Sequence, residues 1–191
     1  MMPVYLSDAK FWRFLMDADE ALAAQVRAAG CPHCAAVLHS ARYPRKPRGV
    51  RRAVLGEDYG WRLSFCCARE GCRRRTTPAS VRFLGRRVYL GALVVLISAL
   101  SQGVTGRRRA QLRVLFGVSE RTVRRWRVWW REVFPATRWW HAARARFVPP
   151  VDIAQLPASL LERFTAPEPG ARLREALGFL APISIAVHQA R

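Results

Sequence analysis

The sequence predicts a mainly α-helical protein with one small β-sheet. Two observations lead to this fold class. Four of the five cysteines form two closely spaced pairs, which is typical of a small metal-stapled β-ribbon. After residue 85, apolar side chains recur at helical spacing and one tight turn interrupts them. We therefore expect a zinc ribbon followed by a three-helix helix-turn-helix unit, within four segments: an N-terminal amphipathic helix (1–29), the zinc ribbon with a basic loop (30–84), the helix-turn-helix domain (85–134) and a helical, proline-interrupted tail (135–191).

The first expected element is an amphipathic helix over residues 7–29. Apolar side chains recur at helical spacing from Phe11 to Val26. Ser7 is a suitable N-cap because a serine hydroxyl can accept from a free backbone N–H group, and Gly30 is a suitable stop. We expect the apolar face to pack on the rest of the chain; the alternative is packing on a second copy.

The ribbon segment combines a strand signal with loop signals. Residues 59–67 alternate so that Trp61, Leu63 and Phe65 share one face, which predicts a strand. Residues 43–52 are rich in proline and arginine and predict a mobile basic loop. Residues 73–84 are expected to be extended, because Pro78 excludes a helix there.

The spacing of the cysteines indicates a structural zinc site. Zinc takes four ligands in a tetrahedron, and two short cysteine pairs on two loops supply two thiolates each. Neighbouring arginines are expected to lower the pKa of these thiols and so to favour the thiolate that binds metal. We therefore expect one bound Zn²⁺, held by Cys31, Cys34, Cys67 and Cys72.

The adjacent Cys66 and Cys67 compete for one ligand position. In a strand, Cys67 lies on the same face as Phe65 and Cys66 points the opposite way, which favours Cys67 as the ligand. Three alternatives stay open: Cys66 as a ligand, a histidine (His33 or His39) in place of a cysteine, and five free buried thiols.

From residue 86 the pattern predicts three helices, at roughly 86–101, 107–115 and 119–133. Gly117 permits a tight turn before the third helix, and Ser119 caps that helix. Val123 and Trp126 recur on one side, which leaves a surface rich in arginine on the other. The third helix of such a unit fits the major groove with its early residues near base edges. We expect base contacts from Arg121, Thr122 and Arg125.

The tail predicts short helices at 136–146, 157–164 and 170–180. The neighbouring tryptophans are expected in a core or a partner surface, with stacking on unpaired bases as the alternative.

Positive charge is concentrated in two blocks. The chain has 33 Lys and Arg residues against 13 Asp and Glu residues, a net charge of +20, which favours a polyanionic partner. Residues 42–87 and 107–131 carry net charges of +11 and +8, and residues 88–106 between them carry none. Two basic blocks that coincide with two modules indicate a nucleic-acid footprint. We expect phosphate contacts from seven arginines: Arg73, Arg74, Arg75, Arg107, Arg108, Arg109 and Arg124.

The longest apolar run, residues 88–100, is too short to cross a bilayer and suits a buried helix. No secretory pattern is visible at the N-terminus. We therefore expect a cytoplasmic protein with no membrane partner, in which cysteines serve metal binding more often than disulfides.

The motifs "CPHC" and "RLSFCCAREGCRRRTTP", followed by "GVSERTVRRW", resemble the N-terminal zinc ribbon and DNA-binding region of bacterial insertion-sequence transposases, in particular small proteins associated with mobile elements. The resemblance covers residues 30–131 and implies zinc ligation by the four paired cysteines. One departure is the second pair, which has four intervening residues where two are usual. The other is catalytic, because the approximately sixty residues after Glu132 are too few for the RNase H-like domain of these transposases.

These observations together predict a DNA-binding protein that reads sequence, an accessory factor or regulator of a mobile element without a catalytic centre of its own. Its expected partners are double-stranded DNA and either a recombinase or transposase or a second copy of itself. The alternatives are an RNA-binding zinc protein and a truncated transposase or nuclease.

Overall fold

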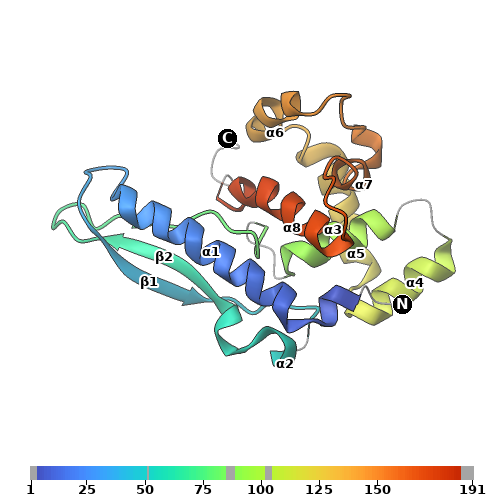
Figure 1. The fold of residues 1–191 in the computed structure, drawn as a ribbon, viewed down its shortest axis with the longest axis horizontal. Coiled ribbons are helices and arrows are strands. Elements are labelled where there is room, and N and C mark those ends of the chain that lie inside the picture. Colours follow the sequence, from blue (N-terminus) through green and yellow to red (C-terminus); the bar gives the residue numbers. More distant parts are fainter. Residues whose placement is uncertain (1–3, 51, 85–88, 102–104, 186–191) are drawn as a thin grey trace.

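The computed structural model describes residues 4–50, 52–84, 89–101 and 105–185. They form a mainly helical chain with one three-stranded antiparallel sheet, which confirms the fold class at this level (Figure 1). The strands are β1 (Leu38–Pro44), β2 (Trp61–Cys67) and β3 (Arg75–Thr76). The α-helices are α1 (Ala9–Ala29), α2 (Arg52–Leu55), α3 (Gly91–Leu100), α4 (Gly106–Phe116), α5 (Glu120–Val128), α6 (Arg138–Ala143), α7 (Ala158–Leu161) and α8 (Pro169–Leu180). Short helical turns are η1 (Val4–Ser7), η2 (Glu57–Gly60), η3 (Trp129–Val133, a π turn), η4 (Arg144–Arg146), η5 (Ile153–Gln155) and η6 (Ala181–Ser184).

The N-terminal helix begins later than its sequence pattern predicts. Asp8, not Ser7, is the N-cap of α1, and its carboxylate accepts from the backbone N–H of Lys10 at 2.9 Å. Ser7 instead ends the preceding turn η1. Gly30 ends the helix as predicted, with a φ of +76° and its N–H donated to the carbonyl of Arg27.

The buried face of α1 packs on the rest of the chain. Phe11, Trp12 and Leu15 are buried in the main core. Ala23, two turns further on, is buried against the sheet in a second, smaller cluster. Figure 1 shows α1 lying along the sheet and reaching the helical half of the molecule. One helix therefore contributes to both hydrophobic clusters.

The sheet has the order β1-β2-β3, and β2 covers residues 61–67 of the strand predicted at 59–67, whose first two residues belong to the turn η2. Its register pairs Leu38 with Cys67 at one end and Pro44 with Trp61 at the other. The strand β1 was not predicted, and its last residues lie where a mobile loop was expected. The sequence of β1, LHSARYP, lacks the strict alternation of apolar and polar residues that predicts a strand, and only Leu38 is fully buried. The segment forms a strand because it pairs with β2.

A buried ion pair joins α1 to the segment after the sheet. Asp19 lies on the buried face of α1, and its carboxylate accepts from Arg82 at 2.8 Å; the two side chains are 0% and 2% exposed. The same carboxylate accepts from the hydroxyl of Ser80 and from the N–H of Val81. Arg82 also donates to the carbonyls of Tyr59 and Trp61 at 3.0 Å. The Asp19–Arg82 pair therefore connects α1, the start of β2 and residues 80–82.

The helical half is built around α3. Its residues from Gly91 to Ser98 are all buried, and it contacts α5, α7 and α8. This burial agrees with the prediction that the longest apolar run forms a buried helix. In the described part of the chain, no helix is long and apolar enough to span a membrane. The predicted tail helices correspond to α6, α7 and α8, and their large buried side chains share the main core with α1: Trp140, Leu160, Leu173, Leu177 and Leu180.

The turn between α4 and α5 has the expected chemistry. Gly117 adopts a φ of +59°, a region that favours glycine. Ser119 is the N-cap of α5, with its hydroxyl accepting from the N–H of Thr122. The third helix continues through the π turn η3, in which the N–H of Phe134 donates to the carbonyl of Trp129 at 2.8 Å. Pro135 follows.

We predict that Asp19→Asn lowers the free energy of unfolding by about 3–5 kcal/mol, because it leaves the buried Arg82 guanidinium without its counter-charge. The control is Asp17→Asn, which breaks the exposed ion pair with Arg13 on the same helix and is expected to cost less than about 0.5 kcal/mol. Chemical denaturation of both variants measures the difference. Equal losses in the two variants would contradict the role assigned to Asp19.

Candidate metal centre and basic surfaces

The first cysteine pair lies in the turn between α1 and β1. The backbone N–H of Cys34 and that of Ala35 both donate to the carbonyl of Cys31, and the N–H of Cys31 donates to the carbonyl of Ala36. These bonds fold the chain into a tight knuckle. A Cβ atom at Gly30 would lie 2.9 Å from the carbonyl oxygen of Ala35, so glycine is required where the helix enters this knuckle.

The second cysteine pair brackets the turn between β2 and β3. Cys67 is the last residue of β2, and its N–H donates to the carbonyl of Arg74 at 2.9 Å. The N–H of Cys72 donates to the carbonyl of Arg69, and Gly71 and Arg73 adopt positive φ values of 83° and 43°. The longer spacing of this pair is thus taken up by a compact turn.

The four paired cysteines meet at one point. Their sulfur atoms all lie within 4.8 Å of one another. Cys31 and Cys72 are 3.8 Å apart, and Cys34 and Cys67 are 3.5 Å apart. A tetrahedron with metal–sulfur bonds of about 2.3 Å, the value for zinc, places its sulfurs about 3.8 Å apart. A disulfide needs about 2.05 Å. The cluster therefore fits a tetrahedral metal ion such as zinc.

A small apolar cluster surrounds the sulfurs. Cys31 and Cys67 are buried and pack with Ala23, Leu38 and Phe65. The prediction that Cys67 lies on the same face of β2 as Phe65 is therefore confirmed.

The protein environment moves the pKa of two of these thiols in opposite directions. The backbone N–H of Ala36 lowers the pKa of Cys34 to about 7, with smaller contributions from the other three thiols. Burial raises the pKa of Cys67 to about 12. The arginines that were expected to lower the thiol pKa values are not the cause of the shift at Cys34. A bound dication would instead supply the charge that keeps the buried Cys67 as a thiolate.

The alternative ligands lie elsewhere. The Cys66 sulfur donates to the carbonyl of Arg73 at 3.5 Å and is outside the cluster. His33 is exposed, with its Nδ1 3.1 Å from a guanidinium nitrogen of Arg74. His39 is exposed on β1 opposite Cys66. Within the described ranges, the four cysteines are the group of His, Cys, Asp or Glu side chains that could hold a metal.

One exposed basic surface follows directly from the cysteine turn. Arg73, Arg74 and Arg75 are all exposed, and Arg75 begins β3 opposite Cys66. The positions of these arginines are therefore set by the same turn that brings Cys67 and Cys72 together.

A second basic surface lies on α5. Arg121, Arg124 and Arg125 are exposed, while Val123 and Trp126 are buried as predicted. Thr122 was predicted to be exposed, and this prediction is wrong. Its exposed fraction is 7%, and its hydroxyl lies 2.9 Å from that of the capping Ser119. Thr122 lies four residues before the buried Trp126 on the same side of α5, so it is not on the surface that was assigned to base contacts.

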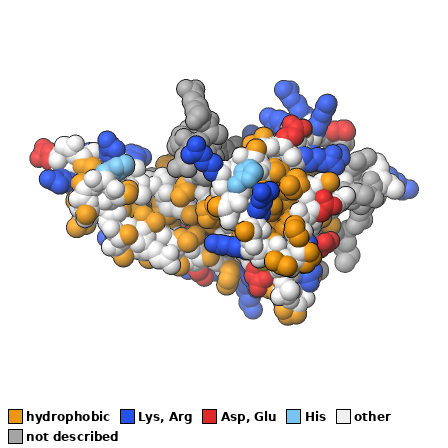
Figure 2. Space-filling view, turned by 90° about the horizontal axis from the view of Figure 1, so that it is seen from above, with side chains coloured by type: hydrophobic (Ala, Val, Ile, Leu, Met, Phe, Trp, Pro, Cys, Tyr) orange, Lys and Arg blue, Asp and Glu red, His pale blue; other side chains and the backbone are white. Residues whose placement is uncertain are grey.

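The remaining predicted phosphate contacts lie on α4. Arg107 is exposed there, and the side chains of Arg108 and Arg109 lie outside the described residues. Figure 2 looks onto the face that carries α6, where Lys and Arg side chains lie around the edge of the helical half and apolar side chains gather toward its centre. This face therefore mixes basic and apolar side chains.

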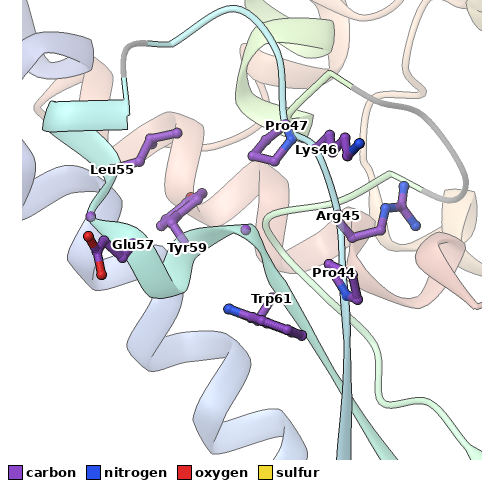
Figure 3. Close-up of a pocket in the computed structure, with 10 residues that line it drawn as sticks. Pro44, Arg45, Lys46, Pro47, Leu55, Glu57, Tyr59 and Trp61 are labelled. Carbon is purple, nitrogen blue, oxygen red and sulfur yellow. The ribbon is translucent and has the colours of Figure 1, made fainter.

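A cleft that sequence reasoning did not single out lies where the sheet meets the helical half (Figure 3). It has a volume of about 570 Å³. One wall is formed by residues 44–47 at the end of β1, and the other by residues 55–57 and 59–61. The available sequence signal was the pair of aromatic residues Tyr59 and Trp61, close in sequence to a loop rich in proline and arginine.

Comparisons of the chain with protein-family models, with curated proteins and with solved structures find no match. The chemistry of the site is therefore argued from its own geometry.

We predict that Cys67→Ser loses the bound metal and that Cys66→Ser retains it, because only Cys67 belongs to the sulfur cluster. Zinc per chain, measured by elemental analysis of protein prepared under reducing conditions without chelators, is expected to be close to one in the parent and in Cys66→Ser. The reverse pattern in the two variants, or a parent with less than half an equivalent of zinc, would contradict the assignment.

Proposed function

We propose that the protein is a zinc-stabilised, sequence-reading DNA-binding protein. The observation that carries this proposal is the division of α5 into two faces. One face buries Val123 and Trp126 against the core, and the other exposes Arg121, Arg124 and Arg125. Among the described residues, none of these arginines forms an ion pair. Arginine side chains free of acidic partners on a supported helix suit phosphates and guanine edges, to which arginine donates bidentately.

The arrangement around α5 supports a helix-turn-helix interpretation. α5 follows α4 through the tight turn at Gly117, and the side of α5 opposite its exposed arginines packs on the buried helix α3. The N-terminal end of α5 is fixed by the Ser119 cap. In helix-turn-helix proteins the N-terminal residues of the second helix contact base edges. Arg121 and Arg125 are the residues of α5 that we assign to bases, and Arg107 and Arg124 are assigned to phosphates.

In this proposal the four-cysteine cluster holds structural zinc. Four thiolates complete the tetrahedral coordination of zinc and leave no open position for catalysis. The apolar cluster around the cysteines contains few residues, so metal binding would supply much of the folding energy of this end of the sheet. The ion would also hold the turn that carries Arg73, Arg74 and Arg75, which we assign to phosphate contacts.

The biological role that we propose is that of an accessory factor or regulator of a mobile element. The support is the resemblance of residues 30–131 to the DNA-binding region of insertion-sequence transposases. A recombinase, a transposase or a second copy of the chain would be its protein partner. The RNA-binding alternative shares the same basic surfaces and is separated by competition between duplex DNA and duplex RNA.

Binding to duplex DNA is predicted to weaken strongly as salt rises. Each neutralised phosphate contributes about −0.9 to the slope of log K against log salt concentration, and the two basic surfaces can reach about 6–10 phosphates. The slope is therefore expected at about −5 to −9 in fluorescence anisotropy titrations. A slope near zero would remove phosphate contacts from the proposal.

We further predict that Arg121→Ala and Arg74→Ala weaken binding in different ways. A preferred site is first selected from random duplexes. Arg121→Ala is expected to cost about 1–3 kcal/mol on that site and much less on random DNA, because it removes a base contact. Arg74→Ala is expected to weaken both by the same amount.

The control for this pair is Arg146→Ala, which removes an exposed arginine of η4 outside both basic surfaces and is expected to change neither affinity. If Arg121→Ala weakens both DNAs equally, or no preferred site emerges, α5 does not read sequence. Tighter binding of duplex RNA than of the selected DNA would favour the RNA-binding alternative.

A further inference from the structure

A small cavity opens on the surface beside α6. It has a volume of about 290 Å³ and is lined by residues that all come from positions 140–153: Trp140, Arg144, Ala145, Phe147, Pro150, Val151 and Ile153. Trp140 and Val151 are buried, so a ligand would contact mainly the other five, of which Phe147 is half-buried and the rest are exposed. Pockets for small molecules usually measure about 300–1,000 Å³. This cavity therefore suits one or two side chains of a partner protein better than a cofactor.

The accessible lining is apolar and mostly not aromatic. Ile153 is 39% exposed, and Val148, in the loop between Phe147 and Pro150, is 91% exposed. Apolar side chains that gather in one patch mark interaction sites, whereas single ones need no explanation. Phe147 is the one aromatic residue of the accessible lining, and its ring already packs against Phe164 and Phe179. A base needs a free aromatic face on which to stack, so this lining favours apolar protein side chains over an unpaired nucleotide.

The loop on one side of the cavity is fixed before a partner arrives. A guanidinium nitrogen of Arg163 donates to the carbonyl of Pro150 at 2.8 Å. The hydroxyl of Ser159 donates to the carbonyl of Asp152 at 2.6 Å, and the carboxylate of Asp152 accepts from the N–H of Ala154 at 2.8 Å. A preformed surface lowers the entropic cost of binding.

The cations on this side of the molecule have no acidic counterparts. Residues 133–151 contain three arginines, Arg138, Arg144 and Arg146, and no Asp or Glu. All three are exposed, and none forms an ion pair within the part of the chain that the structure describes. The carboxylate of Asp152, next to the cavity, is engaged as the cap of η5. Figure 2 shows basic side chains beside apolar ones on this face. An acidic partner therefore complements it in charge.

We propose that this cavity binds an acidic segment of a partner protein, with one apolar side chain of that segment against Phe147, Pro150 and Ile153 and a carboxylate on Arg144. A second copy of the chain fits less well, because an isologous contact through this surface would bring its arginines against their own counterparts. The inference goes beyond the proposed function, since neither α5 nor the cysteine cluster takes part in this contact.

Short random peptides displayed on phage are the probe for this surface. They are selected on the full-length, zinc-loaded protein in the presence of excess duplex DNA, which occupies the basic surfaces assigned to DNA. We expect the selected peptides to combine a large apolar residue with Asp or Glu close to it, because an apolar anchor fills the cavity and an acid meets its edge. Selected peptides that lack this combination overturn the proposal.

Two variants then test the cavity with one selected peptide, synthesised with a fluorescent label. Ile153→Ser removes part of the apolar lining and is expected to weaken peptide binding about five- to tenfold, because anchor pockets carry much of the binding energy of an interface. Arg144→Glu reverses the charge at the edge. It is expected to weaken binding about threefold or more and to reduce its dependence on salt.

Each variant has a matched control outside the cavity. Val128→Ser removes an apolar side chain of α5 that is 43% exposed, and Arg27→Glu makes the same charge change in the last turn of α1. Neither residue lines the cavity, so neither variant is expected to change the affinity for the peptide. Because all four side chains are exposed, every variant is expected to melt within about 2 °C of the parent.

The outcomes separate this inference from its competitors and from the proposed function. Unchanged peptide affinity in both Ile153→Ser and Arg144→Glu overturns it, because the peptide then binds elsewhere. Single-stranded DNA that displaces the peptide and loses affinity in the same two variants assigns the surface to nucleic acid and overturns it. Self-association of the parent that Ile153→Ser abolishes assigns the surface to a second copy and also overturns it. Duplex DNA binding is measured separately, so either proposal can fail while the other stands.

Discussion

The buried ion pair between Asp19 and Arg82 is the interaction on which the arrangement of the chain depends. It joins α1 to the segment that leaves the sheet, and the same guanidinium holds the carbonyls of Tyr59 and Trp61 at the start of β2. Replacement of a buried ion pair by apolar groups often costs little stability, whereas loss of one partner costs much. The pair therefore acts here chiefly as a constraint on position: α1, β2 and residues 80–83 meet in one arrangement.

The sheet connects the region of the ion pair to two sites, one at each end of the β1–β2 pairing. Its register pairs Pro44 with Trp61 beside the cleft and Leu38 with Cys67 beside the cysteine cluster. Strands of this length separate the two sites by about 20 Å. The cysteine turn orders its end of the sheet locally, and the ion pair orders the other. The two sites are thus held on one rigid element, at opposite ends.

Local signals predicted much of the structure. The α-helices from α3 to α8, the Ser119 cap and the choice of Cys67 over Cys66 follow from spacing and turn chemistry within a few residues. Features that depend on distant partners were not predicted. Asp19 lies at helical spacing from Leu15 and Ala23, but the partner that makes its burial possible, Arg82, is 63 residues away in the sequence. Likewise, β1 becomes a strand only through pairing with β2. Thr122 is a different case, because its burial was within reach of the sequence: it lies four residues before Trp126 and eight before Trp130, which are both buried.

The central claim, that α5 reads the major groove, is tested most directly by dimethyl sulfate footprinting on the selected duplex. This reagent methylates N7 of guanine in the major groove and N3 of adenine in the minor groove. The account predicts protection of guanine N7 within the site, and loss of protection at a single guanine when Arg121 is replaced by alanine, because arginine pairs with N7 and O6 of guanine. Protection confined to adenine N3, or an unchanged pattern in the variant, would contradict it.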